Sequence, residues 1–175
     1  MMNFEQLKFN VDAYKSHDQI TDAAKFVVRA YGLDHHNLAG FDYREELDPK
    51  SILLTANGDV GERITVQIPR NLFDFDFNLV VNMLAHEMMH VRQKSPEEMV
   101  MDKNEREWQA YYEMLFHEIF PQVPEVSNFH KKFFANKALE YYRRMGEESD
   151  LQLKYAEQKN KVQELIARLD EKVNI

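Results

Sequence analysis

Apolar side chains recur every three or four residues along most of this chain, a spacing that is typical of amphipathic helices. Gly32, Pro121 and Gly146 closely follow the ends of three such segments, as expected of residues that stop helices. Only five Gly and five Pro occur in the whole sequence, which also favours long helices. The pattern predicts helices over residues 18–31, 76–94, 104–120, 127–144 and 149–173.

Two short runs depart from this spacing and are rich in β-branched residues, at 51–55 and 63–68. Asn57-Gly58 lies between them, and Asn-Gly between such runs predicts a β-hairpin. The preceding stretch, 34–50, is polar and has no regular period. Together the patterns predict a helix-dominated α+β fold with a small antiparallel sheet.

The length and the apolar content favour one domain with a substantial core, because 44% of the 175 residues are hydrophobic. We assign residues 1–146 to this domain and 147–175 to a C-terminal amphipathic helix. Apolar residues in that helix follow a heptad spacing for about three heptads. The helix is therefore expected to pack on the domain, or to join two copies in a homodimer.

Composition restricts the possible chemistry. The chain has no cysteine, which excludes disulfide scaffolds, thiolate metal sites and thiol nucleophiles. Its net charge of −8 makes nucleic acid an unfavourable partner. No apolar run approaches the ~18 residues of a membrane span, and the N-terminus lacks a secretory signal pattern. We therefore expect a cytoplasmic protein whose metal sites, if any, use His, Asp and Glu.

One motif stands out in the helix predicted over 76–94. The sequence His86-Glu87-Met88-Met89-His90 has the form HExxH. Residues four apart on a helix differ by only about 40° around its axis, so both imidazoles can bind one metal ion. The side chain of Glu87 projects about 100° from that of His86, which suits a general base rather than a ligand.

The surroundings of the motif strengthen this interpretation. Most other positions of the helix are apolar, so it is expected to be buried nearly all round. Two imidazoles and a carboxylate in such a place are costly unless they are paired or bound to metal. The alternative is that both histidines form ordinary hydrogen bonds in a core without metal. The adjacent His35 and His36 point in different directions and are expected to be surface residues.

Residues 84–90, Leu-Ala-His-Glu-Met-Met-His, together with the preceding hairpin, resemble the active-site helix of the zincin metallopeptidases. In the gluzincin group the third zinc ligand is a Glu on a later helix, often in an E-x-x-A setting. Residues 107–110, Glu-Trp-Gln-Ala, match that setting. The longer metzincin pattern is absent, because Pro96 stands where it would need a third histidine. The resemblance covers about 51–120 and implies a zincin-like fold, with zinc held by His86, His90 and Glu107.

The chain departs from the family pattern after Ala110, where Tyr111 replaces the usual Asp. That Asp normally accepts a hydrogen bond from a ligating histidine. Asn82 and Gln93 lie on the same side of their helix as the two histidines and are candidates to replace it.

Periodicity leaves other candidates open for the third ligand. The apolar centre of the helix predicted over 104–120 lies roughly 40° from Glu105 and roughly 120° from Glu107. Glu105 is therefore the main alternative to Glu107, and Glu113 is a more distant one.

The resemblance implies a zinc-dependent peptidase that hydrolyses peptide or protein substrates with a zinc-bound water activated by Glu87. The strand predicted over 63–68 is a candidate edge for pairing with an extended peptide. A domain of this type that binds metal or peptide without turnover is the alternative function, and a metal-free helical scaffold is a third. The candidate donors to the oxyanion of the reaction are Tyr111, Tyr112, His117 and His130.

Overall fold

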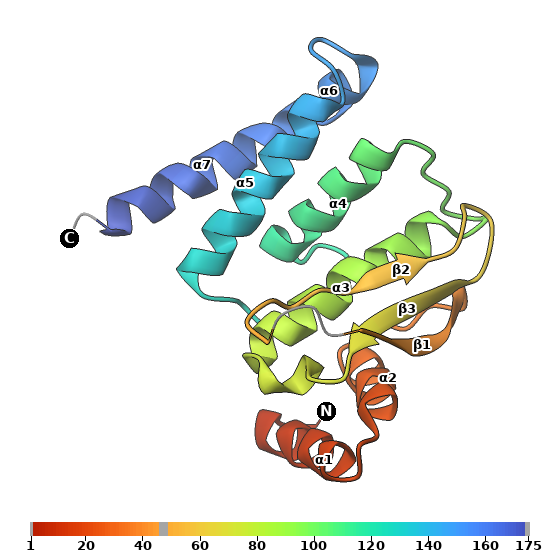
Figure 1. Ribbon diagram of the computed structural model, residues 1–175. Coiled ribbons are helices and arrows are strands. Elements are labelled where there is room, and N and C mark those ends of the chain that lie inside the picture. Colours follow the sequence, from red (N-terminus) through yellow and green to blue (C-terminus); the bar gives the residue numbers. More distant parts are fainter. Residues whose placement is uncertain (1, 46–48, 174–175) are drawn as a thin grey trace.

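The computed structural model describes residues 2–45 and 49–173, with side chains as far as residue 171. Within these residues the chain forms seven α-helices, one 3-10 turn and a three-stranded sheet (Figure 1). The predicted helix-dominated α+β fold is confirmed. The elements are α1 (Phe4–Ser16), α2 (Ile20–Ala30), β1 (Leu38–Arg44), β2 (Thr55–Asn57), β3 (Ile64–Pro69), η1 (Leu72–Asp74), α3 (Phe77–Gln93), α4 (Lys103–Phe116), α5 (Asn128–Arg144), α6 (Asp150–Lys154) and α7 (Ala156–Val173).

The sheet has the strand order β1-β3-β2. Strands β2 and β3 are antiparallel, with Ala56 opposite Val66, so the predicted hairpin is confirmed. The bounds predicted for its first strand, 51–55, are wrong, because β2 covers Thr55–Asn57 and includes the Asn of Asn57-Gly58. The prediction of a purely antiparallel sheet is wrong, because β1 pairs with β3 in parallel. This third strand lies in the polar stretch 34–50, and most of its residues are only partly buried.

The predicted helices over 18–31, 76–94 and 127–144 agree with α2, α3 and α5. Helix α4 ends at Phe116, four residues before the predicted end, because His117 adopts a left-handed conformation. The carboxylate of Glu113 then accepts the backbone N–H groups of Ile119 and Phe120 at 2.8 and 2.7 Å. Helix α1 was not predicted, and the helix predicted over 149–173 is broken at Tyr155.

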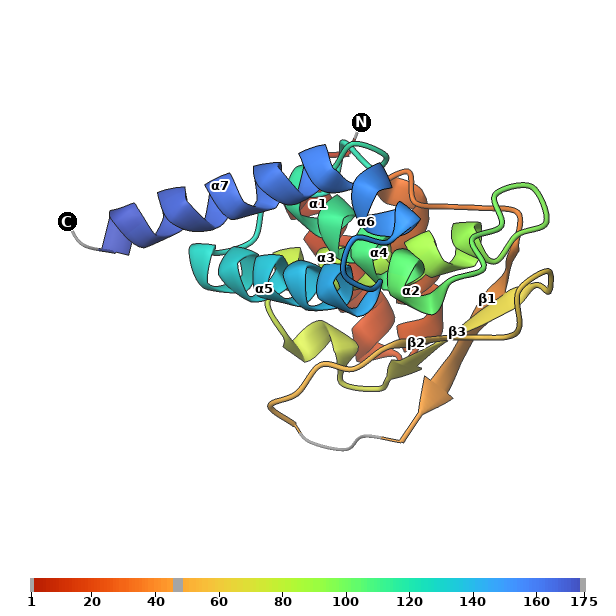
Figure 2. The same cartoon turned by 90° about the horizontal axis from the view of Figure 1, so that it is seen from above.

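Two apolar clusters meet at α3, which lies between the sheet and the C-terminal helices (Figures 1 and 2). The first cluster joins the sheet to α2 and to one side of α3, with Val66 and Leu84 among its members. The second joins α4, α5 and α7 around Trp108 and Phe134, and Leu79 of α3 belongs to it. Thirteen of the seventeen residues of α3 are buried, as its apolar composition predicted.

The C-terminal helix α7 packs against α5, and Tyr155 and Val162 are buried in the second cluster. The division of the chain at residue 146 and the homodimer remain predictions. Among the residues described, no helix combines the length and the apolar content that crossing a membrane would require.

Candidate metal centre

Helix α3 supplies two ring nitrogens to one point. Its N-terminus is capped by Asp76, whose side chain accepts the N–H of Leu79 at 3.0 Å. One turn apart near its other end, His86 and His90 are buried, and their Nε2 atoms lie 3.1 Å from each other. The helical spacing of the motif therefore brings both imidazoles together, as predicted.

Helix α4 packs against α3 and adds a carboxylate to this pair. Glu107 places Oε2 3.4 Å from Nε2 of His86 and Oε1 3.5 Å from Nε2 of His90. Among the residues described, these three side chains are the only group of three or more His, Asp or Glu residues arranged to hold a metal ion.

The spacing of the three side chains fits a metal ion. Tetrahedral coordination with bonds of about 2.0–2.1 Å sets neighbouring ligand atoms about 3.3–3.4 Å apart. The two histidine nitrogens lie 3.1 Å apart, and each lies 3.4 or 3.5 Å from a different oxygen of Glu107. One ligand atom from each residue can be chosen so that all three lie within 4.8 Å of one another. Two buried ring nitrogens that face each other also require a cation or a proton between them, since both lone pairs otherwise repel. The donor set His86, His90 and Glu107 could therefore hold a metal.

Electrostatics support the same interpretation. Burial disfavours the charge of the Glu107 carboxylate, but its hydrogen bonds with both imidazoles outweigh that effect and hold its pKa well below the ordinary range. Burial likewise opposes protonation of His90, yet the bond to Glu107 and the charges of Glu87 and Glu107 raise its pKa above the ordinary value. The group is thus an anionic pocket that favours a bound cation.

The other two glutamates considered for the third ligand have different partners. Glu105 accepts hydrogen bonds from Tyr155 and Lys154 at 2.6 and 2.7 Å. Glu113 closes the turn after α4, as described above. Helix α4 packs on two sides, and its apolar centre faces α5 and α7 rather than α3. Because the helical wheel located the ligand from this apolar centre, it favoured Glu105. The structure brings only Glu107 of the three to the histidines.

The two histidines differ in their outer partners. Nδ1 of His90 lies 2.9 Å from Oε1 of Gln93, so one of the two predicted replacements for the family Asp is in place. Asn82 instead bonds to His117 and to the backbone carbonyls of Asn78 and Pro124. In the described part of the chain, Nδ1 of His86 is buried without a partner, and the ring of Tyr111 packs 4.6 Å from the His86 ring.

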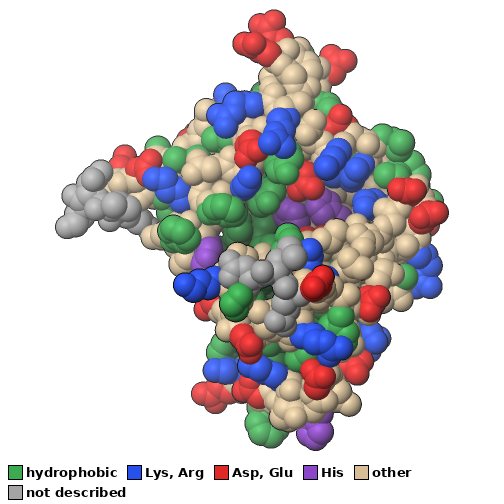
Figure 3. Space-filling view, viewed as in Figure 1, with side chains coloured by type: hydrophobic (Ala, Val, Ile, Leu, Met, Phe, Trp, Pro, Cys, Tyr) green, Lys and Arg blue, Asp and Glu red, His purple; other side chains and the backbone are tan. Residues whose placement is uncertain are grey.

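The group opens into a cavity of about 440 Å³ between the sheet and helices α3, α4 and α5. Glu87 and the three candidate ligands line this cavity together with Tyr111, Tyr141 and residues 53–56. Histidine side chains are visible at the base of the hollow in Figure 3. The central strand β3 is paired on both sides, so the prediction that 63–68 forms the edge is wrong. The edge strand beside the cavity is β2.

Of the four predicted oxyanion donors, only Tyr111 lies at this cavity. Tyr112 donates to Glu118, and His117 and His130 contact Asn82 and Ser127. Burial, and next the charge of Glu107, raise the pKa of Tyr111 well above its ordinary value, so its hydroxyl stays protonated and can donate.

The sequence pattern did not place Tyr141 of α5 at this site. Its ring stacks on that of Tyr111 with centroids 5.9 Å apart, and it lines the same cavity. Its position depends on the packing of α5 against α4, for which the sequence carries no motif.

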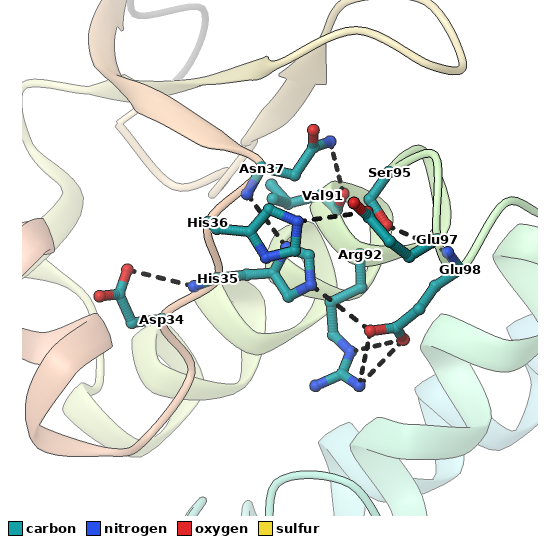
Figure 4. Close-up of polar contacts among 9 residues, drawn as sticks. All are labelled: Asp34, His35, His36, Asn37, Val91, Arg92, Ser95, Glu97 and Glu98. Carbon is teal, nitrogen blue, oxygen red and sulfur yellow. Dashed lines mark hydrogen bonds and ion pairs between the residues drawn. The ribbon is translucent and has the colours of Figure 1, made fainter.

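His35 and His36 lie away from the cavity, in the loop before β1 (Figure 4). Nε2 of His35 is 3.4 Å from Glu98, and Nε2 of His36 is 3.2 Å from Glu97. Arg92 also forms an ion pair with Glu98, at 2.9 Å. These contacts join the loop before β1 to the connection between α3 and α4, and they lie away from the three candidate ligands.

Comparisons of this chain with protein-family models, with curated proteins and with solved structures found no match.

Proposed function

We propose that this chain is a zinc-dependent peptidase, with His86, His90 and Glu107 as metal ligands and Glu87 as general base. The observation that carries the proposal is the convergence of these four side chains on one cavity beside an edge strand. The likeness of residues 84–90 and 107–110 to the motifs of gluzincins adds support.

Two His and one Glu form a donor set that catalytic zinc sites use, with a further position left open. A zinc ion held there supplies Lewis acidity, which makes a water molecule nucleophilic near neutral pH and polarises a peptide carbonyl. Glu87 faces the same cavity as the ligands without being one of them. Its carboxylate takes the proton of the attacking water and passes it to the leaving amine.

An extended peptide is the substrate shape that the cavity favours. Residues 53–56 line the cavity, and β2 has a strand partner on one side only in the described sheet. Its other side can pair with the main chain of a peptide and place a scissile carbonyl near the metal ligands. Tyr111 then donates a hydrogen bond from its hydroxyl to the oxyanion that develops on that carbonyl.

The test is metal analysis combined with a cleavage assay. Protein purified without chelator or nickel resin should contain close to one zinc per chain and cleave members of a peptide library. Cleavage should stop on removal of the metal and return with zinc. The double variant His35→Ala/His36→Ala is the matched control and should keep its zinc. Protein that takes up no zinc, or that holds iron instead, would contradict the metal assignment; zinc without cleavage would contradict the peptidase.

Tyr111→Phe should lower kcat by about 10²-fold with little change in KM, because it removes one donor to the oxyanion. Steady-state kinetics on a cleaved library peptide measure this. Tyr112→Phe is the control from the next position, since the Tyr112 hydroxyl bonds to Glu118 and not at the cavity. A wild-type kcat for Tyr111→Phe would rule out the donor role.

A further inference from the structure

We infer that Gln93, Gln109 and Tyr155 are positioning residues that hold His90 with its proton on Nδ1, leaving Nε2 free to bind a metal. The inference rests on the proposed function, because it assigns these residues a role toward the same metal centre. It also gives the C-terminal segment a part in a site that lies on α3 and α4.

The first link is the side-chain amide of Gln93, whose orientation is set by a backbone group. Its Nε2 donates to the carbonyl oxygen of Arg106 at 3.0 Å and to Oε1 of Gln109 at 2.9 Å. A backbone carbonyl can only accept, so the NH₂ group must face α4. Oε1 of Gln93 therefore faces His90, and at 2.9 Å it requires a proton on Nδ1.

The second link extends the chain in the same direction. Since Oε1 of Gln109 accepts from Gln93, its Nε2 is left to donate to the Tyr155 hydroxyl at 2.5 Å. Tyr155 in turn donates to Oε1 of Glu105 at 2.6 Å. Every donor in the series points away from His90 and toward the Glu105 carboxylate.

The direction of these hydrogen bonds cannot be reversed, because the carbonyl of Arg106 at one end and the carboxylate of Glu105 at the other can only accept. Turning the Gln93 amide over would set its oxygen against the carbonyl oxygen of Arg106. Turning the Gln109 amide over would set its NH₂ group against the NH₂ group of Gln93, and its oxygen against a Tyr155 hydroxyl that already donates to Glu105. Gln93, Tyr155 and Glu105 are all buried, so a donor or acceptor of theirs that is left without a partner is costly. Burial and the bond to Glu105 also raise the pKa of Tyr155, which keeps its hydroxyl protonated.

The last donor of the series, the hydroxyl of Tyr155, comes from the break between α6 and α7. Tyr155 ends α6 outside the helical conformation, and its ring lies 6.0 Å from that of Trp108 in the second apolar cluster. From there its hydroxyl reaches α4. By contrast, Nδ1 of His86 has no partner within the described residues, so the chain of hydrogen bonds distinguishes His90 from the other histidine.

The variants Gln93→Leu and Tyr155→Phe test this series, with Tyr142→Phe as the matched control. Tyr142 also donates its hydroxyl at the α6 side of the molecule, to the carbonyl of Gln152 at 2.8 Å, but takes no part in the chain to His90. The first measurement is the exchange with water of the His90 Nδ1 proton, followed by NMR in metal-free protein. The second is zinc affinity, measured by competition with a chromophoric chelator.

In wild-type protein the Nδ1 proton of His90 should exchange slowly. Gln93→Leu should speed its exchange and weaken zinc binding about 10- to 100-fold. Tyr155→Phe should do the same to a smaller extent, about two- to tenfold, the value of one hydrogen bond. Tyr142→Phe should match wild type in both. In the double variant, Tyr155→Phe should add nothing to Gln93→Leu, because its effect passes through Gln93.

Wild-type proton exchange and zinc affinity in Tyr155→Phe would overturn the inference, as would equal losses in Tyr155→Phe and Tyr142→Phe. Either result leaves the proposed function standing if the wild type binds zinc. A wild type that binds no zinc ends the proposed function instead, while the proton exchange in metal-free protein still decides the hydrogen-bond chain.

Discussion

Glu87→Gln is expected to lower kcat for peptide hydrolysis by about 10²- to 10⁴-fold while zinc content stays near one per chain. Glutamine has the same shape as glutamate but cannot accept the proton of the attacking water. Glu87 lines the cavity and is not one of the three grouped ligands, so the metal should remain. Kinetics and metal analysis on the same preparation measure both quantities.

The contrast with Glu107→Gln makes this experiment specific, because that variant should lose zinc and activity together. A Glu87→Gln protein that cleaves at the wild-type rate would show that Glu87 is not the base. One that loses its zinc would instead make Glu87 part of the metal centre.

Glu107→Gln is expected to weaken zinc binding by more than ~100-fold, beyond the usual cost of losing an outer hydrogen-bond partner. The amide is neutral, whereas the carboxylate faces Nε2 of both histidines at 3.4 and 3.5 Å. Glu105→Gln, two residues away on the same helix, should weaken binding at most about tenfold, since its amide oxygen can still accept from Tyr155.

Competition with a chromophoric chelator ranks the two variants, and Glu113→Gln provides a third point from the end of the same helix. If Glu105→Gln loses more affinity than Glu107→Gln, the third ligand has been assigned to the wrong glutamate.

Local spacing was enough to predict most helices, but not β1. Its residues Leu38–Arg44 alternate weakly and are mostly half-buried, because the strand pairs only along one side with β3. The antiparallel partner β2 was foreseen from Asn57-Gly58, a signal that β1 lacks. The early end of α4 depends on Glu113 bonding to a turn beyond the helix, and apolar periodicity does not register such a bond.

At the site, too, local spacing predicted some residues, whereas others depend on tertiary packing. His86, Glu87, His90 and Gln93 share one helix, so the residue spacing alone placed them correctly relative to each other. Glu107 needed the additional E-x-x-A motif, because the wheel of α4 favoured the side that faces α5 and α7. Tyr141 and Tyr155 come from other helices, and only tertiary packing brings them to α3 and α4.

The central position of α3 has a consequence for the robustness of the protein. This helix supplies one face to the apolar cluster on the sheet side and another to the cluster of the C-terminal helices. If either cluster came apart, apolar side chains of α3 would become exposed to water. This shared helix favours a single cooperative unfolding transition. A packing defect at Val27 in the first cluster, or at Val162 in the second, is therefore expected to lower the free energy of unfolding of the whole domain. The same folded state holds His86 and His90 beside Glu107.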